Sequence, residues 1–389
     1  MSHMKIGMDA RWIFPHITGI GKYTEELIRY LAQIDDKNEY ILFFDNPQTL
    51  ERTVDVTGIH DKKHFVPYLV SYSVFSLKNQ FFLPGLLKKL QIELFHSTNY
   101  MIPFRAFKRD RNGAVKCVVT IHDLIPLVFR DHAPKSKKSR MFPLYCKIMN
   151  EVGCRAHCIV CPSLATRADI LERLHIPPDR HDDVIAIPEA AGEQYAPALR
   201  IPASGKTIVY VGRFDPYKNV TQLIKAFSEI HRKEPNTRLR IIGPEDPRYP
   251  EAQEQASTFN LEDAIVWQGY LDEQELLKAY QQADVLVLPS RYEGFGLPVL
   301  EAMACGTPVV CSNVSSLPEV AGQAAALFDP DDTNQLIETV LRILTDPAWA
   351  KELSEKGQKR TSKFTWKRTA ALTLQAYERV MYDDNASRI

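Results

Sequence analysis

Short apolar runs alternate with helical patterns along nearly the whole chain, and this alternation limits the fold more than any other feature. A first series of β-branched runs ends at Val184–Ile187, and a second begins at Thr207–Val211. Apolar strands that alternate with helices predict parallel sheets covered by helices. The 389 residues also exceed the usual length of one domain. The sequence therefore predicts an α/β protein with two Rossmann-like parallel-sheet domains that face each other across a cleft.

The expected elements follow from the position of each run. The expected strands are Lys5–Met8, Tyr40–Phe44, Leu94–His96, Lys116–Ile121, Cys158–Pro162, Val184–Ile187, Thr207–Val211, Leu239–Ile242, Ile265–Trp267, Val285–Leu288, Pro308–Cys311 and Ala326–Phe328. The expected helices are Gly21–Gln33, Thr166–Leu174, Val220–Glu234, Pro250–Phe259, Asp272–Gln282, Pro298–Ala304 and Thr333–Thr345. Pro188–Ser204 lacks periodicity and is the expected linker. We therefore expect domains over 1–188 and 189–364, and a helix over 365–389 that crosses back to the first domain.

Charge and cysteine content narrow the class of protein. The net charge is zero, which gives no general attraction to nucleic acid. The seven cysteines are an odd number and predict reduced thiols in a cytoplasmic protein. Cys154, Cys158 and Cys161 lie near His157 and could suggest zinc, but Cys158–Cys161 has the pattern of a buried strand. No apolar run is long enough to cross a membrane, so we expect no membrane span, and no leader is visible, so we do not expect secretion.

The segment from Val285 to Glu301 carries the strongest functional pattern. An apolar strand leads into Glu293-Gly294-Phe295-Gly296-Leu297, and Pro298 is well suited to a helix start. The N–H groups and dipole at that helix start favour an anion such as a diphosphate. Glu293 ends the entry to the loop, and Glu301 is expected in the first turn of the helix. Each carboxylate could accept hydrogen bonds from a sugar or a ribose. The alternative, an acidic turn that complements the dipole, explains Glu301 but not its glycine-rich context.

A second strand–loop–helix segment supplies positive charge. Val209–Val211 is followed by Gly212-Arg213-Phe214-Asp215-Pro216-Tyr217-Lys218-Asn219. Ligands of open α/β sheets bind at the carboxyl ends of strands, where Arg213 and Lys218 would lie. Two cations there could neutralise a diphosphate leaving group without a metal, although a solvated charge pair is the alternative. The metal-like spacing of Asp329-Pro330-Asp331 is interpreted as a turn before a helix, so no metal ligand is expected.

These motifs resemble those of the family 4 glycosyltransferases. The shared elements are the Glu-x7-Glu segment from Glu293 to Glu301, Asp9-Ala10-Arg11, Thr18-Gly19-Ile20-Gly21-Lys22-Tyr23, Ile121-His122-Asp123-Leu124-Ile125-Pro126, and Gly212-Arg213-Phe214 with Lys218-Asn219. The resemblance covers nearly the whole chain, and the combination is similar to a bacterial mannosyltransferase-like branch that builds surface polysaccharides. It implies a retaining, GT-B-fold enzyme in which residues 1–188 serve the acceptor and residues 189–364 the nucleotide-sugar donor.

The resemblance also implies roles for single residues. Arg213 and Lys218 would contact the donor diphosphate, Glu301 the ribose and Glu293 the donor sugar, while His122 would lie beside the transferred sugar. Four of these, namely His122, Glu293, Arg213 and Lys218, form the implied catalytic group. The implied donor-binding set also contains Gly19 and Gly21 in a loop over the phosphates, and Gln268 and Tyr270 in a loop that binds the base. It further contains the backbone that surrounds the phosphates and the sugar, at Gly294, Phe295, Gly296 and Leu297.

Two histidines end expected strands, and each has a structural alternative. His122 could cap the sheet, but its place at the strand end favours the functional interpretation. For His96 an acceptor-side role and a structural role stand equally open. From Lys78 to Lys147, fourteen basic residues accompany four acidic ones, next to the apolar Phe81-Phe82-Leu83. This surface could rest on anionic lipid at the cytoplasmic face of the inner membrane, or be the solvated face of ordinary helices.

Together these patterns predict a metal-independent retaining transferase without a cofactor. It would move a hexose from a nucleoside diphosphate donor to a glycan or lipid-linked glycan. The resemblance favours GDP-mannose, and a UDP-sugar is the alternative donor. A sugar-nucleotide epimerase of the same fold would need an acid/base set that the sequence does not display. A non-catalytic sugar-binding protein would be expected to lack Glu293 or Arg213, and both are present.

Overall fold

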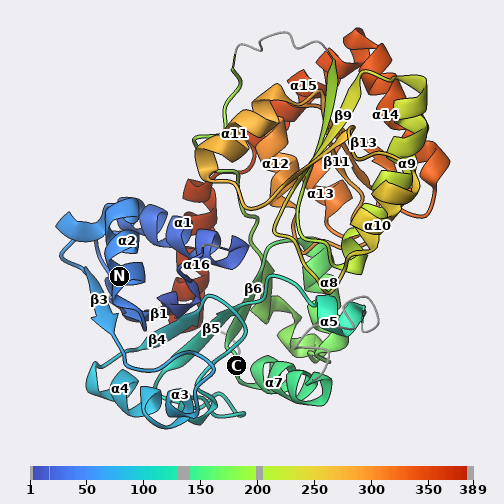
Figure 1. Ribbon diagram of the computed structural model, residues 1–389. Helices are drawn as coiled ribbons and strands as arrows, with labels where there is room; N and C mark the ends of the chain where they lie inside the picture. The colour runs from blue at the N-terminus through green and yellow to red at the C-terminus, as the bar shows by residue number, and fades with distance from the viewer. Residues whose placement is uncertain (1–2, 17, 130–140, 199–204, 383–389) are drawn as a thin grey trace. The chain divides into compact units, whose positions relative to one another are not determined.

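The computed structural model describes residues 3–16, 18–129, 141–198 and 205–382, which form two compact units (Figure 1). The first unit comprises residues 1–124, 141–189 and 366–389, and the second comprises residues 125–140 and 190–365. The helix expected over 365–389 is observed as α16 (Trp366–Tyr382), which packs against α1 (Gly19–Ile34) in the first unit. Residues 125–129, which the sequence assigned to the first domain, belong to the second unit, where the Phe129 ring lies edge-on to Tyr292 at 5.6 Å.

The first unit is built on a seven-stranded parallel sheet with the order β3-β2-β1-β4-β5-β6-β7. Its strands are β1 (Lys5–Asp9), β2 (Glu39–Phe44), β3 (Phe65–Leu69), β4 (Leu94–Ser97), β5 (Lys116–Thr120), β6 (Cys158–Cys161) and β7 (Val184–Ala186). Strand β3 contains Pro67 and was not predicted from the sequence. Proline lacks the N–H that a central strand needs, and β3 accommodates it because it is an edge strand.

Helices connect these parallel strands. Besides α1 and α16 they are α2 (Pro47–Thr57), α3 (Leu77–Phe81), α4 (Leu83–Lys89), α7 (Phe142–Arg155) and α8 (Leu164–Arg173), with short 3-10 turns that include η1 (Ala10–Trp12) and η3 (Phe104–Ala106). Asn46 caps α2 by accepting from Thr49 N at 2.8 Å, and Gly58 ends it in the left-handed conformation at φ 69°. The three cysteines considered for zinc lie at Cys154 on α7 and at Cys158 and Cys161, the two ends of the buried strand β6.

The second unit contains a six-stranded parallel sheet with the order β10-β9-β8-β11-β12-β13. Its strands are β8 (Lys206–Val211), β9 (Thr237–Ile242), β10 (Ile265–Gln268), β11 (Val285–Leu288), β12 (Val309–Ser312) and β13 (Ala326–Phe328). Its helices are α5 (Ile125–Val128), α9 (Val220–Lys233), α10 (Glu251–Thr258), α11 (Glu273–Gln282), α12 (Leu297–Ala304), α13 (Leu317–Ala321), α14 (Thr333–Thr345) and α15 (Pro347–Thr361). The expected pair of Rossmann-like parallel sheets is therefore confirmed.

The core of the second unit explains why its strands read as continuous apolar runs. All four residues of β11 and all four of β12 are buried, because helices cover the sheet. Strand β8 lies between β9 and β11, so the loops after these strands emerge at one edge of the sheet. Across the described parts of the chain, every helix is too short or too polar to cross a bilayer.

Candidate functional site

A carboxylate, Glu293, occupies the loop between β11 and α12 and is bound from two sides. Lys218 Nζ donates to Glu293 Oε1 at 2.8 Å and to Oε2 at 2.9 Å, and Ser290 Oγ donates to Oε1 at 2.7 Å. Glu293 is only 9% exposed, so its charge depends on these donors rather than on bulk water. Lys218 comes from the loop after β8, and the structure thereby joins the two segments that the sequence singled out.

The backbone around Gly296 forms a rigid turn that leads into α12. Gly296 has φ 107°, and a Cβ on it would lie 2.8 Å from Leu317 Cδ2, so only glycine fits easily here. Ser316 Oγ is close to both Glu293 O, at 2.8 Å, and Phe295 O, at 2.7 Å. Helix α12 begins at Leu297 with Pro298 in its first turn, as expected. The positive end of its dipole therefore points toward this fixed loop.

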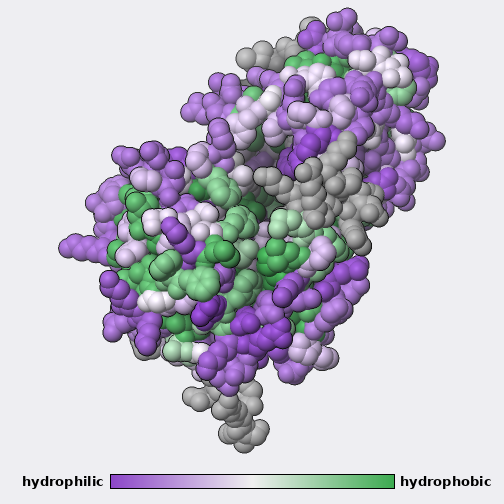
Figure 2. Space-filling view, turned by 60° about the horizontal axis from the view of Figure 1, so that its bottom comes forward, coloured by the Kyte–Doolittle hydropathy of each residue, from purple (hydrophilic) through white to green (hydrophobic). Residues whose placement is uncertain are grey.

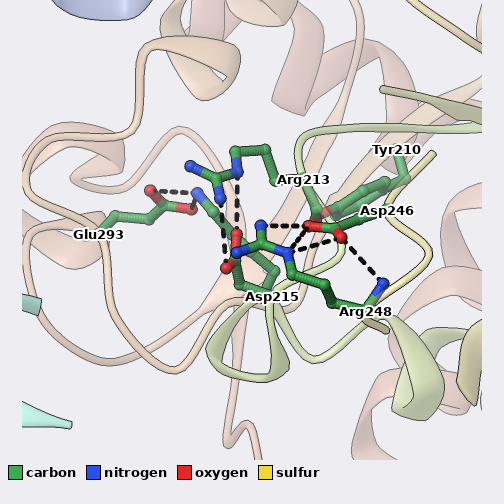
Figure 3. Close-up of polar contacts among 7 residues, drawn as sticks. Tyr210, Arg213, Asp215, Asp246, Arg248 and Glu293 are labelled. Atoms are coloured by element: carbon green, nitrogen blue, oxygen red, sulfur yellow. Dashed lines mark hydrogen bonds and ion pairs between the residues drawn. The ribbon is translucent and has the colours of Figure 1, made fainter. Parts of the chain in front are cut away.

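Arg213 lies in the loop after β8 and is the most exposed cation of the site. Its side chain is 57% exposed, and its Nε lies 2.9 Å from Oδ2 of Asp215, whose side chain is 3% exposed. Tyr210 Oη donates to the Arg213 carbonyl at 2.7 Å and fixes the backbone of the loop. Figure 3 shows Arg213 and Glu293 in the same group of charged side chains. A buried carboxylate thus holds an exposed guanidinium at the edge of the sheet.

Glu301 lies one turn further along α12 than expected. The helix begins at Leu297, which makes Glu301 its fifth residue and places it in the second turn. Its Oε2 accepts a hydrogen bond of 2.8 Å from Tyr280 Oη on α11. Burial, followed by the nearby Glu301 charge, raises the pKa of Tyr280 well above its ordinary value. The phenol therefore stays protonated and remains a donor to this carboxylate.

The two residues of the expected base-binding loop differ in their surroundings. Gln268 ends β10, and its Oε1 accepts from Arg240 Nε at 3.0 Å and from Arg240 Nη2 at 2.8 Å. Tyr270 follows in the loop and is 62% exposed. The Gln268 side-chain oxygen is therefore occupied by hydrogen bonds from Arg240 of β9, whereas the exposed Tyr270 ring is available to stack on a base.

In the first unit, His122 lies just after β5 and contacts Glu189. Its Nδ1 is 3.1 Å from Glu189 Oε1, and its Nε2 is 3.0 Å from the Thr98 carbonyl. The Tyr23 ring packs edge-on against the imidazole at 4.7 Å. Burial lowers the pKa of His122, but Glu189 and the Thr98 carbonyl outweigh it, so the pKa is raised above the ordinary histidine value. This environment favours an imidazolium that donates from both nitrogens.

His96 is fully buried, which favours the structural one of its two interpretations. Its Nδ1 lies 2.6 Å from Tyr377 Oη on α16, and its Nε2 lies 2.8 Å from Thr120 Oγ1. Burial, followed by the charge of His122, lowers the pKa of His96 to about 3. A neutral imidazole with both nitrogens bound fastens α16 to the sheet, and the side chain has no surface that an acceptor could reach.

Gly19 and Gly21 lie inside a helix rather than in a loop. They are the first and third residues of α1, which the sequence analysis began only at Gly21. Thr18 caps the helix, and its Oγ1 accepts from Gly21 N at 3.3 Å. Gly19 is exposed, with no atom within 4 Å of the place where a Cβ would be. The expected flexible glycine loop is therefore replaced by a capped helix start, because a threonine N-cap can satisfy the first N–H groups.

Several residues of the second unit's site were not predicted from the sequence. Ser290, Ser316 and Tyr280 carry no pattern of their own, since serine and tyrosine are common in any loop or helix. Asp246-Pro247-Arg248 could have been noticed, because it follows β9 at the same sheet edge as Arg213. Asp331 N donates to Asp329 Oδ1 at 2.9 Å, and Asp332 caps α14, which agrees with a turn before a helix.

Comparison with known proteins gives matches along both units. Residues 17–188 match the model of Glycosyltransferase Family 4, and residues 193–360 match that of Glycosyl transferases group 1. An O-antigen chain mannosyltransferase B of Escherichia coli is 28% identical over 410 aligned positions, covering 96% of this chain and 100% of that protein. A serotype-specific mannosyltransferase of Escherichia coli is 30% identical over 302 positions, and this match covers 74% of the chain but only 36% of the relative.

Solved structures support the same fold at low sequence identity. The sucrose-phosphate synthase of Thermosynechococcus elongatus superimposes with a TM-score of 0.77 at 22% identity, over 98% of this chain and 100% of that one. WaaG, a glycosyltransferase involved in lipopolysaccharide biosynthesis, gives a TM-score of 0.69 at 15% identity, over 95% and 98%. The two parallel sheets, the two loop motifs and the two family models all point to the same family. The chain therefore belongs to the glycosyltransferases of the GT-B fold, with a Family 4 domain followed by a group 1 glycosyl transferase domain.

Proposed function

We propose that this glycosyltransferase moves mannose from GDP-mannose to a hydroxyl group of a glycan or lipid-linked glycan, with retention of the anomeric configuration and without a metal. The mannosyl specificity is supported by the O-antigen chain mannosyltransferase, which this chain matches over that relative's full length. The donor site is supported by the joint position of Lys218, Glu293 and the start of α12. That arrangement is the observation that carries the proposal, because it brings a cation, a carboxylate and the start of a helix together within one loop cluster.

The chemistry requires stabilisation of the leaving diphosphate. As the acceptor oxygen forms its bond to the anomeric carbon, the bond to the diphosphate breaks and negative charge grows on the departing oxygen. Arg213, Lys218 and the α12 dipole would stabilise that charge in place of a metal ion. The proton of the acceptor hydroxyl would pass to the leaving diphosphate on the same face. Glu293 would accept hydrogen bonds from the donor sugar, and Glu301 from the ribose.

Nucleotide binding offers a first test of this proposal. We expect GDP to raise the melting temperature more than UDP or ADP, because the nucleotide with the lowest Kd stabilises the folded state most at equal concentration. A ligand at about 100 times its Kd adds about 2.7 kcal/mol. GDP-mannose turnover should survive treatment with EDTA. A thermal-shift screen followed by product NMR checks the base, the metal and the retained anomeric configuration.

The outcomes separate this proposal from its rivals. A larger shift with UDP would replace GDP-mannose by a UDP-sugar, while the transferase proposal would stand. Conversion of the donor to an epimer without an acceptor would point to a sugar-nucleotide epimerase. An inverted product would contradict retention, and loss of turnover in EDTA would contradict metal independence.

We also propose that the first unit rests on anionic lipid through a surface formed by its α3–α4 region, here called the apolar–basic patch. Its apolar members are unusually exposed, with Leu77 at 77%, Phe81 at 60% and Phe82 at 60%. Its basic members are Lys78, Lys88, Lys89 and Arg105, all exposed. The Arg105 guanidinium lies 4.7 Å from the centroid of the Phe81 ring. Apolar rings beside cations match the acyl boundary and headgroups of an anionic bilayer.

The shape of this region agrees with a surface contact. An open hollow of about 410 Å³ is lined by residues that include Leu69, Lys78 and Phe82. Figure 2 turns this end of the first unit toward the viewer and shows green apolar areas bordered by purple polar ones. The further basic residues that the sequence places nearby lie outside the described residues, namely Arg130, Lys135, Lys137, Lys138 and Arg140.

Vesicle binding tests the patch. Each buried phenylalanine contributes roughly 1.5–3 kcal/mol, so Phe81→Ser/Phe82→Ser should weaken binding to phosphatidylglycerol-containing vesicles by at least about 10-fold. Co-sedimentation measures this, with Phe259→Ser, an exposed phenylalanine of the second unit, as the matched control. Unchanged binding by the double variant, or equal binding to neutral phosphatidylcholine vesicles, would rule out the patch as an anionic lipid surface.

A further inference from the structure

The loop that follows β9 is fixed directly beside the loop that carries Arg213. A Cβ on Gly243 would lie 1.9 Å from the Gly212 carbonyl oxygen, so only glycine allows the two backbones to approach this closely. Gly212 N donates to Ile242 O, and Gly243 N donates to Gln268 O, both at 2.9 Å. The side chains that follow Gly243 therefore start from the same sheet edge as those that follow Gly212.

That second loop presents an arginine held by its own carboxylate. Arg248 Nε lies 2.8 Å from Asp246 Oδ1, and Arg248 Nη2 lies 2.5 Å from Asp246 Oδ2, which is a two-pronged contact. The Arg248 side chain is 39% exposed. Tyr249 is buried at 2% exposure and anchors the loop behind it. Figure 3 shows the Arg248 guanidinium extending toward Asp215 and Arg213, so this pair belongs to the same charged group.

Arg248 compensates the negative charge that Asp246 adds to this group. Its cations are Arg213, Lys218 and Arg248, and its carboxylates are Asp215, Asp246 and Glu293. Without Arg248, two positive charges would face three negative ones. A diphosphate brings at least two further negative charges, and a net negative site would repel it. The hydrogen bond from Arg248, with a smaller contribution from the Arg213 charge, lowers the pKa of Asp246.

We propose that Arg248 is a third ligand of the donor diphosphate, and that Asp246 orients its guanidinium and competes with the phosphate for it. This inference rests on the proposed donor site. A carboxylate and a phosphate present similar pairs of oxygens to the guanidinium fork, so the phosphate can replace Asp246 with little rearrangement of Arg248. Asp246 is therefore a positioning residue, whereas Arg248 contacts the donor.

The two residues should have opposite effects on nucleotide affinity. Loss of a charge-assisted contact should make Arg248→Ala bind GDP about 10- to 100-fold more weakly, whereas GMP binding should change less because it lacks the second phosphate. Asp246→Asn removes the competitor and should bind GDP at least as tightly as the wild type. Arg248→Lys keeps the charge without the fork and should lie between. Isothermal titration calorimetry of the full chain measures the GDP affinity of the wild type and of these three variants.

A matched pair and a reference variant make the result decisive. Arg232 forms a similar pair with Glu229 at 2.7 Å on α9, and Arg232→Ala should leave GDP affinity unchanged. If Arg213→Ala weakens GDP binding while Arg248→Ala stays within about 2-fold of the wild type, Arg248 is not a ligand, although the donor site stands. If Asp246→Asn weakens GDP binding as much as Arg248→Ala does, the pair is only a loop brace. If neither Arg213→Ala nor Arg248→Ala affects binding, the donor site itself is wrong.

Discussion

The Lys218→Ala variant is expected to lose transfer activity by about 10²–10³-fold, since removing one preorganised group that stabilises transition-state charge has effects of this size. Lys218 Nζ lies within 2.9 Å of both Glu293 oxygens, and in the proposed mechanism it also faces the leaving diphosphate. Its loss would leave Glu293, at 9% exposure, without its cation. Initial rates with GDP-mannose and an acceptor glycan measure the effect on kcat and KM.

Controls separate a catalytic loss from a folding defect. Lys225→Ala removes an exposed lysine from α9 of the same unit and should retain wild-type rates. Arg213→Ala removes a second cation of the group and should also reduce kcat. Lys218→Ala should keep a cooperative melting transition, because Lys218 is not a member of the second unit's hydrophobic core. Wild-type rates in both Lys218→Ala and Arg213→Ala would refute the assignment of the diphosphate site.

The Arg11→Met variant is expected to destabilise the first unit by about 3–5 kcal/mol, because breaking a buried ion pair leaves a buried charge without compensation. Arg11 is 1% exposed. Its Nε and Nη2 donate to the Asp9 carboxylate at 2.7 and 2.6 Å, and Nη2 also donates to Asn79 Oδ1 at 2.9 Å. Arg11 thus ties the end of β1 to α3. Urea unfolding, followed by circular dichroism, measures the loss.

Two further variants test this interpretation. Arg173→Met breaks an exposed contact of 3.5 Å with Glu172 in the same unit and should cost less than about 1 kcal/mol. The double variant Asp9→Leu/Arg11→Met removes both charges and should recover part of the stability lost in Arg11→Met. If Arg11→Met lowers the free energy of unfolding by less than about 1 kcal/mol, the Asp9–Arg11 pair does not hold the end of β1 to α3.

Elements with a local sequence signal could be predicted from the sequence. Buried strands such as Val285–Leu288 are recognisable because every residue is apolar, and the following glycines and Pro298 mark the loop and helix start. Strand β3 was not predicted, because Pro67 interrupts the usual strand pattern of this edge strand. The first turn of α1 was not predicted either. The glycines of that turn suggested a loop, but the Thr18 cap stabilises a helix start that local propensity does not favour.

Histidines show the limit of position as a guide. His96 lies near the carboxyl end of β4 and His122 just after β5, and position alone favoured a functional role for His122 but left the role of His96 open. The structure distinguishes them through residues distant in the chain. Tyr377, 281 residues away, buries and binds His96, whereas Glu189, 67 residues away, holds His122. Burial and charge partners decide whether an imidazole is neutral or cationic, and both depend on contacts between distant segments.

The sequence by itself determined the two α/β units, the loops after β8 and β11, and the residue types that those loops carry, because strand and turn patterns depend on neighbours in the chain. Only the tertiary structure joined Lys218 to Glu293 across 75 residues, placed Gly243 against Gly212 and brought Arg248 into the same charged group. Sheet order and close packing decide these contacts. A parallel sheet brings distant loops to one edge, and the electrostatics of the site arise there.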